Sequence, residues 1–465
     1  MKAPFIWIIF PGVVAFGLFL LRRWYRSTVL AGVILCLILA ILGWQLPIGK
    51  IISLGSWSFQ VDETLTVLGR KLILGDQDRS ILLMVYLMAS FWFGAAYFAK
   101  AGRLFVPMGL AIVALLTAAL AVEPFLYAAL LIEVAALVSV PMLLTPGKPF
   151  DRGILRYITF QTLGMPFILF TEWMVAGVET TPGNIILVMR AAALLGFGFA
   201  FLLAVPPFHT WVVMLAEGSN PYSVSFVVTM LPWMVSLLGL AFLERYTWLR
   251  NSEMVQLVLR LSGLLMALTG GIGIAFQRQL GRIFGFAVLA DIGFSIMALG
   301  LPPGGYQLFF AMILPKAISF GVWALALAIL KSSSEELNFS RVRGLAKSMP
   351  VATAGLILSH LSVAGFPLLA GFPVRLALWQ EVAKISSWQA SLAFVAGLGL
   401  IISALRTLSV LVAGSDEQDL HVTETWQSVI LLGLGIIALL FVGLFPQWFL
   451  PSLVKGLLAF THLGP

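Results

Sequence analysis

The sequence predicts an all-α integral membrane protein that forms a single polytopic domain over residues 1–465. Hydrophobic residues make up 60% of the chain and charged residues only 10%, and the mean hydropathy is +1.03. Soluble domains carry about 25% charged residues. Apolar runs of about 20 residues, each long enough to cross a bilayer, recur along the chain. Such runs favour helices over the shorter alternating strands of a β-barrel, because a helix satisfies its own backbone polar groups in lipid.

These runs predict about fourteen transmembrane helices. They cover residues 3–21, 28–46, 81–98, 104–121, 124–145, 154–177, 185–206, 222–243, 255–276, 283–301, 305–330, 351–373, 387–412 and 426–446. The first run has no small-residue cleavage site, so we expect a retained helix and not a signal peptide. Lys and Arg concentrate in the odd-numbered loops, for example at Arg22 and Arg343. The positive-inside rule makes these loops cytoplasmic, which predicts both termini on the outer side of a bacterial inner membrane.

The composition argues against cofactors on this chain. Cys36 is the only cysteine, the four histidines are scattered without an HExxH pattern, and no glycine-rich phosphate loop follows a strand. We therefore expect no metal and no cofactor here, and any redox chemistry belongs to a partner. The net charge of +8 and the pI near 9.7 reflect basic residues in short loops at the lipid surface, so no nucleic acid is expected.

Prolines interrupt two of the predicted spans in a similar way. Pro206 and Pro207 end the seventh span, and Pro367 and Pro373 lie in the twelfth. Proline removes a backbone donor and clashes with the preceding turn, so both helices are expected to be discontinuous. One such site alone indicates a kink or a helix end. Two sites five spans apart are typical of inverted repeats, here two five-helix units at about 104–243 and 255–412. Spans one to three occupy 1–100, and the final span occupies 426–446.

Four charged residues lie deep in or next to the apolar spans: Glu133, Asp291, Lys316 and Arg375. An ionisable group at mid-membrane costs at least ~2.5 kcal/mol, so it needs a partner or a function. A carboxylate and a lysine in one bundle suit proton transfer, and we predict a proton pathway through these residues. The alternative is a buried ion pair that only fixes helix packing. Arginine stays charged in proteins, so Arg375 would act electrostatically.

Four motifs, in order, resemble the antiporter-like membrane subunits of respiratory complex I, relatives of Mrp antiporter and membrane-bound hydrogenase subunits. The stretch Pro207–Trp211 resembles the family's PFHTW segment, and Gly281–Phe294 resembles its K-R-x-x-A-Y-S-S stretch with the following G-F. Arg343–Pro350 resembles the R-G-L loop, and Ala364–Phe372 resembles the A-G-I-P-P motif of the broken twelfth helix. His209 within the first motif, together with Glu172 and Arg190 near span ends, are accessory candidates. Glu172 and Arg190 are equally explained as interfacial anchors.

The resemblance implies a proton route made by a glutamate in the fifth span, lysines in the seventh and eighth, and a lysine or glutamate in the twelfth. Glu133 matches the first, and Lys316 is similar to a lysine that some members carry in the eleventh. The chain departs elsewhere: no lysine occurs near Ala200–Leu202 or Pro232–Trp233, and Arg375 replaces the twelfth-span residue.

These features lead to three hypotheses about function. The first is a membrane-arm subunit, of the shorter middle-of-the-arm type, in a complex I-like redox-driven proton pump with an altered or impaired channel. Its partners would be other membrane subunits, lipid and, at one remove, redox subunits. The second is a subunit of a cation/proton antiporter or ion-coupled transporter without a redox arm. The third is a non-conducting structural subunit.

Overall fold

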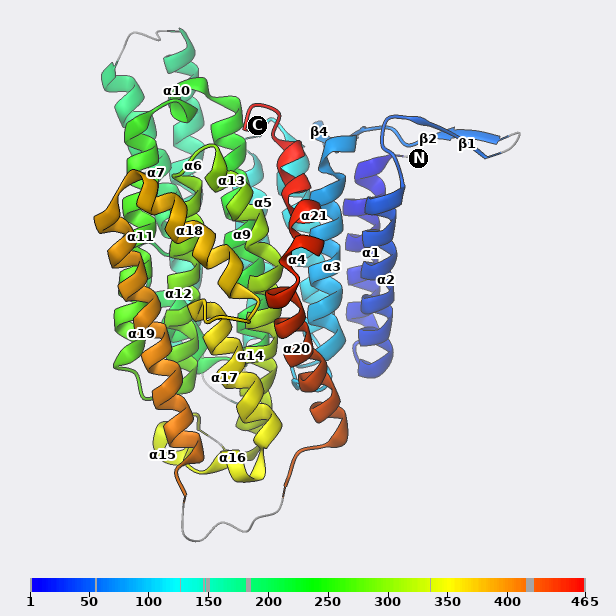
Figure 1. The fold of residues 1–465 in the computed structure, drawn as a ribbon. Coiled ribbons are helices and arrows are strands. Elements are labelled where there is room, and N and C mark those ends of the chain that lie inside the picture. Colours follow the sequence, from blue (N-terminus) through cyan, green and yellow to red (C-terminus); the bar gives the residue numbers. More distant parts are fainter. Residues whose placement is uncertain are drawn as a thin grey trace.

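The computed structural model describes residues 2–54, 57–125, 127–144, 147, 151–180, 185–334, 336–414 and 422–463. They form a bundle of long, roughly parallel helices, with both chain termini at the same end (Figure 1). Among the described helices, eight are long and apolar enough to cross a membrane, and shorter apolar helices accompany them. The prediction of a helical integral membrane protein is therefore confirmed. The total of about fourteen spans stays a prediction.

The N-terminal helices stand at one side of the bundle and carry small sheets at one end (Figure 1). The helical elements are η1 (Phe5–Ile9), α1 (Phe10–Leu20), α2 (Tyr25–Gln45), η2 (Asp76–Asp78) and α3 (Arg79–Ala95). The strands are β1 (Ile51–Leu54), β2 (Trp57–Gln60), β3 (Thr64–Val67), β4 (Arg70–Ile73) and β5 (Val122–Glu123). β1 and β2 form an antiparallel hairpin, and β3, β4 and β5 form an antiparallel sheet in that order. The sequence analysis did not foresee these strands, which are each only two to four residues long.

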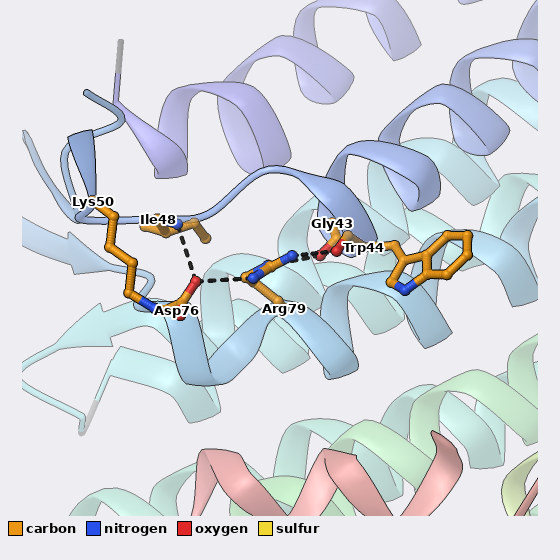
Figure 2. Close-up of polar contacts among 6 residues, drawn as sticks. All are labelled: Gly43, Trp44, Ile48, Lys50, Asp76 and Arg79. Carbon is orange, nitrogen blue, oxygen red and sulfur yellow. Dashed lines mark hydrogen bonds and ion pairs between the residues drawn. The ribbon is translucent and has the colours of Figure 1, made fainter. Parts of the chain in front are cut away.

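One ionic cluster joins the segment between α2 and α3 to both of these helices (Figure 2). Arg79 donates from Nε to the Gly43 carbonyl at 3.2 Å and also binds the Trp44 carbonyl. These carbonyls belong to the last turn of α2, where no intrahelical donor is available and a cation is favoured. Asp76 accepts from Arg79 Nη1 at 3.1 Å, Lys50 Nζ at 2.6 Å and the Ile48 N–H at 3.2 Å. Arg79 therefore links the end of α2 to the start of α3.

The next block begins with α4 and ends with the broken seventh span. Its helices are α4 (Phe105–Ala121), α5 (Tyr127–Leu143), α6 (Arg152–Thr180), α7 (Ile185–Leu202), α8 (Thr210–Gly218), α9 (Pro221–Arg245) and α10 (Thr247–Arg250). Pro206 and Pro207 lie between α7 and α8, in the segment where the helix is interrupted. Asn220 begins α9 by accepting from the N–H groups of Tyr222 at 2.9 Å and Ser223 at 3.3 Å, with Pro221 at the first helical position.

The second block contains the other broken helix. Its helices are α11 (Glu253–Ala275), α12 (Leu280–Leu299), α13 (Gly304–Ala311), α14 (Ile313–Ser333), α15 (Phe339–Val342), α16 (Leu345–Ser348), α17 (Pro350–Ala364), α18 (Gly371–Ile385) and α19 (Ser387–Val412). The chain ends with α20 (Trp426–Leu444), η3 (Pro446–Trp448), α21 (Leu450–Val454) and η4 (Lys455–Ala459).

Two sequence predictions in this block need correction. Pro367 lies between α17 and α18, but Pro373 lies in the first turn of α18 and does not interrupt it. A proline there loses nothing, because the first N–H groups of a helix have no intrahelical acceptor. The helix then continues to Ile385, so Arg375 lies inside α18 and does not follow the broken helix. The predicted eleventh span agrees with the membrane-length segment Gly304–Lys331, in which a one-residue turn at Met312 separates α13 from α14. Because Pro315 has no N–H, it donates no hydrogen bond to the Ala311 carbonyl at this turn.

The core of the bundle is made by α9, α12 and α14. In the membrane-length parts of α9, of α12 and of α13 and α14 taken together, 89%, 89% and 83% of the residues are buried, compared with 28% in α20. A helix that is apolar on all sides and surrounded by protein belongs at the centre of a membrane bundle, whereas α2 and α20 present apolar faces to lipid. Charged groups on α12 and α14 are therefore shielded from lipid by neighbouring helices.

Replacing Asp76 with asparagine should destabilise the protein in a pH-dependent way. Desolvation raises the pKa of Asp76, but hydrogen bonds from Lys50, Ile48 and Arg79 outweigh it and hold the pKa below its ordinary value. An acid with a depressed folded pKa stabilises the fold above its unfolded pKa and loses that effect as pH falls through the folded value. We expect Asp76→Asn to cost about 1 kcal/mol at pH 7, read from the thermal unfolding midpoint in detergent. Asp62→Asn, at an exposed site on the same loop, is the control. A difference between Asp76→Asn and the native chain that stays constant down to about pH 3 would contradict the assignment.

Candidate functional site

One carboxylate at the centre of the second block contacts two cations. Asp291 of α12 approaches Lys316 Nζ of α14 at 2.8 Å through Oδ2, and Arg375 Nη2 of α18 at 3.3 Å through Oδ1. Their exposed fractions are 7%, 9% and 4%, so all three are buried. We call these residues the charged triad. The sequence analysis selected each of them separately, and the structure brings them together.

Close helix packing fixes the position of Asp291. The carboxylate stands on α12, whose first turn is capped by the Gln279 side chain. α12 lies against α11 with glycines at the contact: a Cβ on Gly263 would come within 2.5 Å of the Gly293 carbonyl oxygen. Small residues allow such backbone approach between membrane helices. Gly293 is two positions from Asp291, so this contact determines how far α12 stands from its neighbours.

The break between α17 and α18 places Arg375. Gly365 ends α17 with a φ of +79°, which favours glycine. A Cβ on Gly365 would also meet Arg375 Cγ at 2.7 Å. The Val363 carbonyl, in the last turn of α17, accepts from Arg375 Nη2 at 3.0 Å. The guanidinium carbon lies 3.6 Å from the centre of the Phe294 ring. Arg375 therefore contacts a carboxylate, a helix-end carbonyl and an aromatic face, which suits its planar, multiple-donor group.

A small cavity adjoins Lys316. Its volume is about 10 Å³, room for one water molecule. Polar groups of Trp233, Ser236, Ser295 and Lys316 line it. The two serine hydroxyls donate to main-chain carbonyls at 2.8 and 3.0 Å and keep lone pairs to accept with. Among the described residues the Trp233 indole N–H has no hydrogen-bond partner. A water here would find donors and acceptors on several sides.

A polar stripe continues from Lys316 along α14. Ser319 lies three residues on, and its hydroxyl is 2.8 Å from that of Ser362 on α17. Trp323 follows on the same face and stacks on His360 of α17 at 4.2 Å between ring centres. His360 is fully buried, and neither ring nitrogen has a hydrogen-bond partner among the described residues. His360 was not predicted from the sequence. The sequence feature that could have identified His360 is its position as a lone titratable residue in the apolar run of the twelfth span.

The other candidates lie outside the triad. Glu133 is half-buried on α5, and no ion pair or hydrogen bond between described residues joins it to the triad. Arg190 is exposed on α7. The Glu172 side chain lies outside the described residues. His209 precedes α8, and its Nδ1 is buried with no partner in the described part of the chain.

The charge balance limits what the triad can do. One carboxylate and two cations leave a net charge of +1 when all three are ionised. Arginine keeps its proton in proteins, whereas a buried lysine can release one. Without the charge of Lys316, Asp291 and Arg375 would form a balanced pair.

Comparison with known proteins identifies the family. Residues 158–402 match the family described as NADH:quinone oxidoreductase/Mrp antiporter, TM. The chain belongs to this family. NADH-quinone oxidoreductase subunit 14 of Thermus thermophilus is 26% identical over 317 residues, which cover 66% of this chain and 69% of that protein. The matches to subunit N of three other bacteria span 44–62% of those proteins. The family predicted from four motifs is thus confirmed.

Solved structures support the same fold. A chain of the membrane-bound sulfane sulfur reductase, an archaeal respiratory membrane complex, superposes with a TM-score of 0.83 at 16% identity, covering 99% of this chain and 98% of that one. A chain of respiratory complex I from Thermus thermophilus gives 0.76 at 20% identity, covering 99% and 98%. At these identities the likeness establishes the fold, and the role of the triad rests on its own geometry.

Removing the carboxylate of the triad should cost more stability than removing its lysine. Asp291→Asn leaves two buried cations without a counter-charge, and breaking a buried pair in this way typically costs about 3–5 kcal/mol. Lys316→Met leaves one cation and one anion, so we expect the smaller loss. Thermal unfolding midpoints of both variants in the same detergent test this order. Equal losses would mean that Asp291 does not hold both cations.

Replacing Gly365 with alanine should disturb Arg375 as well as strain the backbone. A left-handed conformation costs alanine roughly 1–2 kcal/mol, and the added Cβ would meet the Arg375 side chain. We expect a lower unfolding midpoint for Gly365→Ala. Gly433→Ala is the matched control, because a Cβ at Gly433 on α20 meets nothing within 4 Å. A control that loses as much as Gly365→Ala would remove the steric argument.

Proposed function

We propose that this chain is a proton-conducting membrane subunit of a redox-driven, complex I-like assembly, and that Lys316 is its central proton-exchanging group. The observation that carries the proposal is the sharing of Asp291 between Lys316 and Arg375 beside a water-sized cavity. When a lysine and an arginine contact the same carboxylate, the proton affinity of the lysine depends on how strongly the arginine binds that carboxylate.

The broken helix supplies a means of changing that competition. Arg375 reaches Asp291 through Nη2 alone, at 3.3 Å, while its Nε and Nη1 are buried without partners in the described part of the chain. A small movement of α18 toward α12 would allow a bidentate contact between Arg375 and Asp291, which is stronger than a single hydrogen bond. Asp291 would then be neutralised by Arg375, and Lys316 would release its proton. The reverse movement would restore the Lys316–Asp291 pair.

Protons need a way to and from Lys316. On one side, the cavity lined by Trp233 and Ser236 leads toward α9, near the position where the resemblance places the eighth-span lysine that this chain lacks. On the other side, Ser319, Ser362 and His360 continue along the contact of α14 with α17. Hydroxyls and imidazoles relay protons when water connects them. Glu133 stays a predicted carrier on α5, a helix that packs against α9.

The assembly and its orientation extend the same proposal. The relatives are NADH-quinone oxidoreductase subunits, and the sequence of this chain contains no redox motif. Redox subunits would therefore lie at one remove, with other membrane subunits as direct neighbours. We also propose that the α15–α16 end of the bundle faces the cytoplasm and that both termini lie on the outer side of a bacterial inner membrane. The concentration of Lys and Arg in the odd-numbered loops supports this orientation.

Proton uptake by membrane vesicles, compared with electron transfer by the same vesicles, tests the role of Lys316. In the assembled complex, Lys316→Met should lower the number of protons moved per electron, because the exchangeable group is gone. Electron transfer should be reduced less. Lys384→Met is the matched control, since Lys384 lies on α18 but is exposed and paired with Glu381 at 2.6 Å.

The other outcomes separate the competing functions. Unchanged proton uptake in Lys316→Met and in Glu133→Gln, with the complex fully assembled, would make the chain a non-conducting structural subunit. Sodium-dependent proton flux without an electron donor would make it part of an antiporter without a redox arm. Purification from mild detergent without any flavin or iron–sulfur partner would also contradict the redox-driven assembly.

A further inference from the structure

A second, larger cavity lies far from the triad along the helix direction, where several helices end. Its volume is about 500 Å³. The N-terminal end of α2, the segment after α3, the end of α14 and the start of α20 surround it. Its lining includes Tyr25, Tyr97, Lys100, Arg103, Glu424 and Gln427. We call this the interfacial cavity.

Exposed tryptophans place the interfacial cavity at the edge of the membrane. Trp24 precedes the lining residue Tyr25 and is 68% exposed, and Trp426 lies between lining residues at the start of α20 and is 70% exposed. Large exposed indoles at helix ends are typical of the headgroup level of a bilayer. This end of the bundle is also the one with the basic loops, where anionic lipids collect.

Two positive charges of the cavity form no ion pair with a carboxylate in the described part of the chain. Lys100 and Arg103 are exposed on a tight turn made by Gly102 at φ +92°, and neither forms an ion pair with a described residue. Glu424 is the one carboxylate among the described lining residues, and it accepts from the N–H groups of Val351 at 3.3 Å and Ala352 at 2.7 Å. These hydrogen bonds cap the start of α17, so the carboxylate of Glu424 is already paired with backbone N–H groups.

The rest of the lining suits a phosphate with polar substituents. Tyr25 donates to the Ala96 carbonyl at 2.8 Å, and Tyr97 accepts from Arg26 Nη2 at 2.8 Å, which holds two aromatic rings 5.8 Å apart at one wall. Arg26 adds a third positive charge behind Tyr97. The first turn of α20, including Gln427, presents backbone N–H groups that favour an anion.

We propose that the interfacial cavity binds the headgroup of an anionic phospholipid, with its phosphate at Lys100 and Arg103. Its acyl chains would then lie along the apolar outer faces of α2 and α20, where Leu30 and Ile430 are exposed. This continuity with lipid-facing surface favours a lipid over free phosphate. The same bound lipid would join the N-terminal helices to α14 and α20 at a place where the cavity separates them.

Native mass spectrometry of the full-length protein in detergent, titrated with phosphatidylglycerol, tests the proposal. We expect one phosphatidylglycerol to remain bound at concentrations where phosphatidylcholine does not. Lys100→Gln/Arg103→Gln should weaken that binding by about tenfold or more, given the usual contribution of each basic residue near a membrane surface. Arg22→Gln/Arg23→Gln is the matched control, because it removes two exposed charges from the neighbouring loop without touching the cavity.

Four results would overturn the proposal. Equal weakening by both double variants would indicate general attraction to a basic surface, and equal binding of both lipids would remove the role of charge. Displacement of phosphatidylglycerol by inorganic phosphate at equal concentration would make the cavity a site for the free anion. A cross-link from Ser333→Cys to another protein subunit in the membrane would indicate that a protein partner occupies the cavity. Unfolding midpoints of all variants, together with the phosphatidylglycerol that co-purifies from membranes, exclude a folding artefact.

Discussion

The Asp291 carboxylate is the group on which the arrangement of the second block depends. It joins α12, α14 and α18 through two ion pairs, although Asp291 and Arg375 are 84 positions apart in the chain. Removing charges from water is costly, and buried ion pairs offset that cost only when geometry and additional hydrogen bonds are good. Here the second cation has no counter-charge, so the three residues stabilise the fold less than one carboxylate paired with one cation would. A site built only for stability would leave out either Lys316 or Arg375, so the surplus charge favours a function.

The broken helix is part of the same constraint. An unbroken helix through residue 365 would use the Val363 carbonyl internally, and no helix end would face Arg375. Arginine can bind this carbonyl, Asp291 and the Phe294 ring together, whereas lysine has a single ammonium group. The resemblance places an exchangeable lysine or glutamate at this point of the family's route. In this chain Arg375, a permanent charge, stands at that point, and the exchangeable group that we propose, Lys316, stands on the neighbouring helix α14.

Sequence reasoning found the components of the site but not their assembly. Asp291, Lys316 and Arg375 were each visible as charges in or beside apolar runs, because a lone charge in lipid is conspicuous. Their meeting depends on how α12, α14 and α18 pack, which no local pattern encodes. The second half of the broken helix was missed because the polar residues Gln380, Glu381 and Lys384 interrupt the hydropathy signal. Glu133 was selected in the same way, and the structure leaves it outside the triad.

The net positive charge of the triad bears on which ion can pass. A sodium ion that approached Asp291 would meet Lys316 and Arg375 at 2.8 and 3.3 Å from the same carboxylate, and it would add a third positive charge to a buried site. Repulsion between like charges is strong where water is scarce. A proton leaving Lys316 instead removes the surplus charge, and its return restores it. If the triad lies on the ion route, it therefore opposes metal cations and accommodates protons, and the same charge imbalance that weakens the packing supplies the selectivity.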